Sequence, residues 1–196
     1  MKKFIFPASI IAILAISRLL PHPPNFTPLM AMTIFGAAFL PKKWNLILPV
    51  AGLFASDIFL GFYGPDMLFV YGSFLLVGII ARWFVNRGIV RLVAITLLGS
   101  VLFFLITNFG VWALWDFYPK TFSGLITCYA AGLPFFRNTL LGDFVYTFSF
   151  VGIYLYLGHA RSLYLLQSRR GGKILSGAGL RTLFSGDQPL REPRRN

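Results

Sequence analysis

Residues 92–115 contain no charged side chain and are rich in Leu, Val, Ile and Phe. An α-helix rises about 1.5 Å per residue, so about 20 apolar residues cross a hydrocarbon core about 30 Å thick. This segment is therefore predicted to span a membrane. The composition agrees, because 57% of the residues are hydrophobic and only 12% are charged, whereas a soluble domain is about 25% charged. These values indicate an integral membrane protein and argue against a disordered chain or a soluble enzyme.

Five further apolar segments are visible, at residues 4–20, 27–40, 44–63, 67–84 and 139–159. Together with residues 92–115 they predict an all-α, polytopic membrane bundle of six transmembrane helices within a domain of residues 1–166. The segment 27–40 is short for a span, which predicts tilt, local mismatch or packing away from lipid. Residues 116–138 are apolar but interrupted by Pro and Gly. They are predicted to form a loop with a short interfacial or re-entrant helix, and a seventh span is the alternative.

Basic residues predict the orientation of these spans. If six spans follow an inner N-terminus, the outer segments hold only Arg18, Lys120 and Arg137, and the other fifteen of the 18 Lys and Arg lie in inner segments. Inner loops of membrane proteins are enriched in Lys and Arg, so both termini are predicted to be cytoplasmic. A cleaved signal peptide at the N-terminus is the alternative to a retained first helix. The net charge of +12 is thus explained by topology, and we expect no nucleic-acid partner.

The last part of the chain, residues 167–196, differs sharply in composition from the rest. It is rich in Gly and Arg and ends in Arg-Glu-Pro-Arg-Arg-Asn. Such a segment buries little apolar surface and is attracted to anionic lipid headgroups. We therefore predict a basic, mostly disordered cytoplasmic tail that contacts membrane lipid, with a tail that binds a protein partner as the alternative.

Polar and ionisable side chains gather near the predicted outer surface and in the outer halves of the predicted helices. Ionisable groups are expensive inside a membrane, so each is a candidate functional residue. One interpretation is that Arg18 pairs with Asp57 or Asp143 and fixes helix packing. The other is an outward-facing pocket for a small molecule, with a polar floor and aromatic walls. The substrate-binding residues predicted by the second interpretation are Arg18, His22, Asn25, Asp57, Tyr63, Asn108, Trp112, Asn138 and Asp143.

Two further features of this predicted outer region bear on a pocket. The stiff segment Pro-His-Pro-Pro-Asn at residues 21–25 is either a rim or lid of the pocket or a plain connector between helices. The aromatic side chains predicted to form the walls are Phe26, Phe59, Phe62, Tyr63, Tyr71, Phe109, Trp112, Tyr129, Phe135 and Phe136.

Motifs that carry catalysis or metal binding are missing from the sequence. It has no Gly-x-x-x-x-Gly-Lys-Ser/Thr loop, no His-Glu-x-x-His and no Gly-x-Ser-x-Gly. Its two histidines, His22 and His159, are predicted on opposite sides of the membrane and cannot share a metal ion. We therefore predict no catalytic residue, no metal site and no cofactor. A membrane-embedded transferase that uses Asp57 or Asp143 remains a third alternative.

Small residues spaced four apart are typical of contacts between membrane helices. Ala8 and Ala12 have this spacing in the first predicted span, and the pairs 51/55 and 52/56 have it in the third. Ordinary packing inside the bundle is one explanation. A docking stripe for a separate membrane subunit is the other.

Several segments resemble an uncharacterised family of small bacterial integral membrane proteins. The resemblance covers roughly residues 18–154 and does not extend to the tail. It implies a location in the bacterial cytoplasmic (inner) membrane. The segments that carry it, together with Arg18, are residues 21–28 (PHPPNFTP), 56–62 (SDIFLGF), 108–112 (NFGVW), 124–136 (GLITCYAAGLPFF) and 142–143 (GD).

That family in turn resembles, more loosely, the substrate-binding S components of energy-coupling-factor (ECF) vitamin transporters. Such components are six-helix proteins that hold a vitamin or metal ion in an outward-facing site. They dock on a transmembrane coupling subunit driven by two ATPases, through an Ala-x-x-x-Ala stripe that Ala8 and Ala12 match. The resemblance implies a substrate-capture subunit for uptake of a vitamin-like molecule, without identifying the molecule. A structural or assembly protein of the membrane, with no transport activity, is the main alternative.

Overall fold

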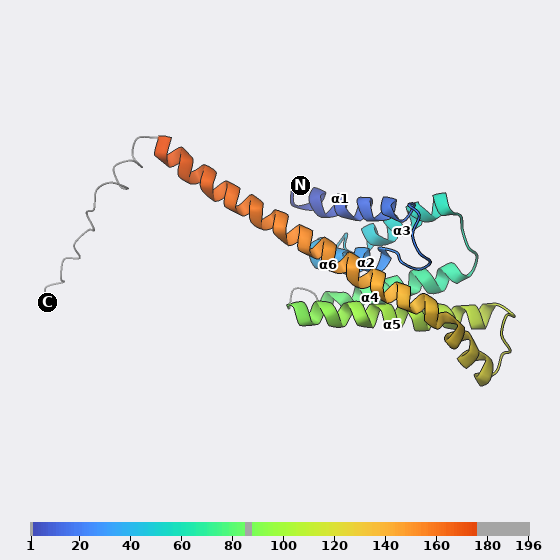
Figure 1. The fold of residues 1–196 in the computed structure, drawn as a ribbon. Helices are drawn as coiled ribbons and strands as arrows, with labels where there is room; N and C mark the ends of the chain where they lie inside the picture. Colours follow the sequence, from blue (N-terminus) through green and yellow to red (C-terminus); the bar gives the residue numbers. More distant parts are fainter. Residues whose placement is uncertain (1, 85–87, 176–196) are drawn as a thin grey trace, which may run out of the picture. The chain divides into compact units, whose positions relative to one another are not determined.

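The computed structural model describes residues 2–84 and 88–175, and within them it contains only helices. Figure 1 shows their order along the chain. The six helices are α1 (Lys2–Ser17), α2 (Leu29–Phe39), α3 (Ile47–Leu60), α4 (Asp66–Phe84), α5 (Ile89–Leu114) and α6 (Phe122–Leu175).

The chain divides into two units, residues 1–152 and residues 153–196. The first unit holds α1 to α5 and the beginning of α6, and every site described below lies in it. In the second unit the described residues continue α6 as far as Leu175. The predicted tail therefore begins as helix, and its remainder, residues 176–196, lies outside the described residues.

Three of the described helices are long and apolar enough to cross a membrane: Asp66–Phe84, Ile89–Leu114 and Phe122–Leu157. The prediction of an all-α fold is confirmed for the described residues, but the prediction of six transmembrane spans is wrong. Helix α2 has 11 residues and α3 has 14, which gives lengths of only about 17 and 21 Å at 1.5 Å per residue. These lengths fall short of a hydrocarbon core of about 30 Å.

Helix α2 is short because it is an internal helix of the bundle. All eight of its residues from Leu29 to Gly36 are buried, and it packs against α1, α3, α4 and α5. A helix that is apolar on every side is stable where other helices surround it. Pro28 precedes its first turn and Pro41 follows its end, where neither residue disrupts the helical hydrogen bonds. Packing away from lipid is thus the explanation for the short second segment.

The prediction of a loop with a separate short helix at residues 116–138 is wrong. The connection covers only residues 115–121, and α6 begins at Phe122 and runs through Pro134 without a break. Thr121 caps this helix, since its Oγ1 accepts a hydrogen bond of 3.1 Å from the Gly124 backbone N–H. Proline removes one helical hydrogen bond, but α6 continues through Pro134 as transmembrane helices often do.

Glycines let the helices approach one another closely. Helices α4 and α5 pack side by side (Figure 1), and a Cβ on Gly110 would lie 2.5 Å from Cγ of Phe69. On α3, a Cβ on Gly52 would lie 2.8 Å from Cε of Met32. This part of the small-residue pattern therefore serves packing inside the bundle. Ala12 on α1 is exposed, and the side chain of Ala8 lies outside the described residues.

Candidate functional site

Several predicted site residues come together at one end of the bundle. Arg18 follows the end of α1, and Asn25 lies in the connector of residues 18–28 that leads to α2. Tyr63 lies between α3 and α4, and Asn108 lies near the end of α5. Asp143 lies on α6, which begins at this end. The alternation of helix directions therefore gathers residues that are far apart in sequence.

A buried ion pair joins Arg18 to Asp57. The guanidinium also donates a hydrogen bond of 2.8 Å to Oγ of Ser56. The Asp57 carboxylate is fully buried, and its Oδ2 accepts hydrogen bonds from the hydroxyls of Tyr71 at 2.6 Å and Tyr63 at 3.5 Å. Burial, with a contribution from the Asp57 charge, raises the pKa of the Tyr63 phenol to about 12. Tyr63 therefore stays protonated and keeps its ability to donate.

This network settles which carboxylate Arg18 pairs with. Of the two predicted partners, Asp57 and Asp143, the structure pairs Arg18 with Asp57. One cation and two tyrosine hydroxyls compensate the Asp57 charge, as a buried carboxylate requires. Asp57 lines neither of the two cavities described below.

Asp143 has a different environment. It is only 3% exposed, and its Oδ2 accepts a hydrogen bond of 2.6 Å from Oγ of Ser100 on α5. The Ser100 hydroxyl also lies 3.0 Å from the backbone oxygen of Thr96, so its single proton is shared. One turn further along α6, the buried hydroxyl of Thr147 has no hydrogen-bond partner among the described residues. Within residues 2–84 and 88–175, no cation pairs with Asp143.

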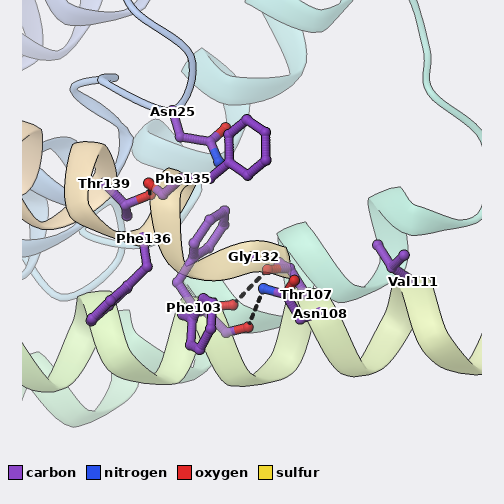
Figure 2. A pocket seen from close by; sticks show the side chains of 10 residues that line it. Asn25, Phe103, Thr107, Asn108, Val111, Gly132, Phe135, Phe136 and Thr139 are labelled. Carbon is purple, nitrogen blue, oxygen red and sulfur yellow. Dashed lines mark hydrogen bonds between the residues drawn. The ribbon is translucent and has the colours of Figure 1, made fainter. Parts of the chain in front are cut away.

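A first cavity, of about 170 Å³, lies between α5, α6 and the connector. We call it the aromatic cavity, because four phenylalanines of these helices form much of its wall. Figure 2 shows the labelled side chains of α5 and α6 facing one another, with Asn25 of the connector beside them. The lining residues are Asn25, Phe103, Phe104, Thr107, Asn108, Val111, Gly132, Phe135, Phe136 and Thr139.

A second cavity, of about 210 Å³, adjoins the first. It shares Asn25, Phe103 and Thr139 with the aromatic cavity. We call it the polar cavity, because Arg18 and Asp143 line it, whereas no charged residue lines the aromatic cavity. Its lining residues are Arg18, Asn25, Thr27, Leu29, Met30, Tyr63, Val70, Phe74, Phe103, Thr139 and Asp143.

The connector of residues 18–28 is tied to α6 beside both cavities. Nδ2 of Asn138 donates a hydrogen bond of 3.0 Å to the backbone oxygen of Pro24. The ring of Phe26 packs on that of Tyr146, with centroids 5.5 Å apart, and a Cβ on Gly142 would lie 3.2 Å from Cα of Phe26. Asn138 thus holds the connector and does not line a cavity itself.

His22 and Trp112 also serve local structure. The two His22 ring nitrogens lie 3.0 and 3.3 Å from the backbone oxygens of Pro23 and Arg18, and a neutral imidazole can donate to only one of them. Nε1 of Trp112 donates a hydrogen bond of 2.9 Å to the backbone oxygen of Pro119, which fixes the turn between α5 and α6. Neither His22 nor Trp112 lines the aromatic or the polar cavity.

Sequence reasoning missed several lining residues, although a helical spacing marks them. Lining residues of α5 fall at positions 103, 104, 107, 108 and 111, and those of α6 at 132, 135, 136, 139 and 143. This is the spacing of one helix face. The loop predicted at residues 116–138 includes residues 132–136, and a loop prediction hides a helical spacing. Of the predicted aromatic walls, Tyr63, Phe135 and Phe136 line one of these two cavities, and the other seven line neither.

The chemical groups of the two cavities suit binding. Their walls are largely carbon, with a few amide, hydroxyl and charged groups, which is typical of small-molecule sites. The described part of the chain holds no group of three or more His, Cys, Asp or Glu side chains that could hold a metal ion. Cys128 is buried, and its Sγ lies 3.4 Å from the backbone oxygen of Asn108.

Residues 1–165 match the model of a family of unknown function (DUF6580), and the chain belongs to this family. Neither a curated protein nor a solved structure matches the chain.

Proposed function

We propose that this member of a family of unknown function binds a small molecule within the membrane and acts as a substrate-capture subunit for its uptake. The observation that carries the proposal is the pair of adjoining cavities, of about 170 and 210 Å³. They lie at the end of the bundle where Arg18, Asn25 and Tyr63 meet. Basic residues are concentrated away from this end, so we propose that it faces outward and that the C-terminus lies in the cytoplasm of a bacterial cell.

In this proposal the two cavities contact different parts of the ligand. In the aromatic cavity, Phe103, Phe104 and Phe136 offer apolar surface to the body of a ligand, and the Asn108 amide offers a polar contact. In the polar cavity, Arg18 and Asp143 offer charged groups. Apolar walls with a few convergent polar groups provide affinity and orientation respectively.

Uptake requires a source of energy, and the sequence contains no ATP-binding loop. We therefore propose that a transmembrane coupling subunit and its ATPases drive translocation, in the manner of ECF transporters. Ala12 is exposed on α1, as docking through an Ala8–Ala12 stripe requires. Proton coupling through a membrane carboxyl group is the alternative that needs no ATPase.

A structural or assembly role is the second candidate. The observation that favours it is the internal pairing of Arg18 with Asp57, since buried ion pairs of this kind also fix the packing of helices.

Native mass spectrometry of the protein purified in mild detergent separates the two roles. A retained small molecule, released on activation and reduced in Asn108→Ala, would support substrate capture. Ile106→Ala, on α5 but outside both cavities, is the control for general loss of packing. A protein that carries no ligand and binds no member of a vitamin panel would favour the structural role.

A further inference from the structure

Counting the charges around the polar cavity reveals an imbalance. Arg18 and Asp143 both line it, but the Arg18 charge is already compensated by Asp57. Asp143 has no cationic partner among the described side chains. Arg18, Asp57 and Asp143 together therefore leave one negative charge when all three are ionised. This charge lies on a residue that is only 3% exposed.

Among the described residues, the Asp143 carboxylate accepts one hydrogen bond, from a hydroxyl that also lies within hydrogen-bond distance of a backbone oxygen. This hydrogen bond comes from Ser100 and reaches Oδ2, while Oδ1 receives no hydrogen bond from that part of the chain. Burying an unpaired carboxylate is costly. At Asp57, the ion pair with Arg18 and the hydrogen bonds from two tyrosines offset the free-energy cost of burial. At Asp143, a positively charged group in the adjoining cavity would offset the same cost.

The cavity wall favours an organic cation over a metal ion. Phe74, Phe103 and Tyr63 line the same cavity as Asp143, and aromatic faces attract ammonium groups. Hard metal ions take six or more oxygen ligands, whereas much of this wall is carbon. The volume of about 210 Å³ also suits a substituted nitrogen.

We propose that the ligand of this site carries a positively charged nitrogen that binds the Asp143 carboxylate. Its aromatic or apolar body lies in the aromatic cavity, past the shared residues Phe103 and Thr139. The assignment rests on the proposed function, since it names the substrate class of the same site. It also gives the two buried aspartates different roles, with Asp143 binding the ligand and Asp57 holding Arg18.

Three probes with the same phenylethyl body and end groups of different charge test the assignment on the full-length protein in detergent. They are 2-phenylethylamine, a cation at neutral pH, 2-phenylethanol, which is neutral, and 3-phenylpropionate, an anion. We expect the amine to bind at least tenfold more tightly than the alcohol, and the anion to bind most weakly. Thermal stabilisation as a function of probe concentration gives the three apparent dissociation constants.

Matched substitutions locate the effect at Asp143. Asp143→Asn keeps the size of the side chain and an acceptor for Ser100, and should weaken amine binding about tenfold while leaving alcohol binding unchanged. Asp143→Glu retains the charge and should restore part of the preference. Asp116→Asn removes a fully exposed carboxylate and should alter none of the three constants. An equal loss for amine and alcohol in a folded Asp143→Asn protein would show that Asp143 does not recognise the charge of the ligand and would overturn the assignment.

Other outcomes separate this inference from the proposed function. No amine binding, equal binding of the three probes, or a preference for the anion overturns the cation assignment. The assignment is also overturned if sodium chloride stabilises the protein, the amine does not, and the effect of sodium chloride is lost in Asp143→Asn. If native mass spectrometry then releases a ligand without a basic nitrogen, substrate capture stands and only the cation assignment fails. Absence of any ligand, together with failure of the vitamin panel, removes the proposed function itself.

Discussion

At the scale of single residues, the Arg18–Asp57 pair makes the sharpest prediction. Removing one partner of a buried ion pair leaves the other charge unpaired and costs about 3–5 kcal/mol. We expect Asp57→Ala and Arg18→Ala each to lower the free energy of unfolding by this amount, and the double variant to lose much less than their sum. Denaturant unfolding of the purified variants in detergent measures these changes in the free energy of unfolding. Asp116→Ala, at a fully exposed carboxylate, is the control and should have no measurable effect. Additive losses in the double variant would contradict the pairing.

The tyrosines around Asp57 predict a graded effect. Tyr71 donates to the carboxylate at 2.6 Å and Tyr63 at 3.5 Å, and hydrogen bonds weaken with distance. Tyr71→Phe should destabilise the protein by about 1–3 kcal/mol, because a hydrogen bond to a charged group is lost. Tyr63→Phe makes the same chemical change and should cost less than half as much. Thermal unfolding of both variants checks the order, and a larger effect at Tyr63 would refute it.

The sequence predicts the charged residues of the site better than its walls. Arg18 and Asp57 stand out because charges are rare in apolar segments, and their pairing was one of the two interpretations of them. Phe103 and Phe104 do not stand out, because 17% of the chain is aromatic. Whether Asp143 or Asp57 lacks a cation depends on how α1, α3 and α6 pack. Hydropathy alone does not contain that information.

At the scale of helices, the same limit explains the misassigned segments. Hydropathy finds α2, but cannot tell a helix surrounded by protein from one that faces lipid, since both are apolar. For α6, Pro134 and two nearby glycines predict an interruption. The helix nevertheless continues, and Gly132 lets it approach α5 closely, since a Cβ there would lie 2.4 Å from Oδ1 of Asn108. The cap at Thr121 is readable from the sequence as a helix start.

The α4–α5 contact predicts different outcomes for two glycines. A Cβ on Gly110 would lie 2.5 Å from Cγ and 3.0 Å from Cβ of Phe69, whereas a Cβ on Gly72 meets nothing within 4 Å. Gly110→Ala should therefore cost about 1–3 kcal/mol through overpacking. Gly72→Ala should be neutral or slightly stabilising, because alanine favours helix. Thermal unfolding in detergent compares them, and equal melting temperatures would show that this contact is looser than described.

At the scale of the whole molecule, three long helices are enough to predict a topology. With α4, α5 and α6 as spans, the junction around Arg91 lies on one side of the membrane and the α5–α6 turn around Asp116 lies on the other. Basic residues flank the first of these positions, which predicts that it is cytoplasmic. In a Cys128→Ser background, Asp116→Cys should react with a membrane-impermeant maleimide in intact cells, and Arg91→Cys only after lysis. The reverse pattern would place the two cavities at the cytoplasmic face, where they could not capture a substrate from outside.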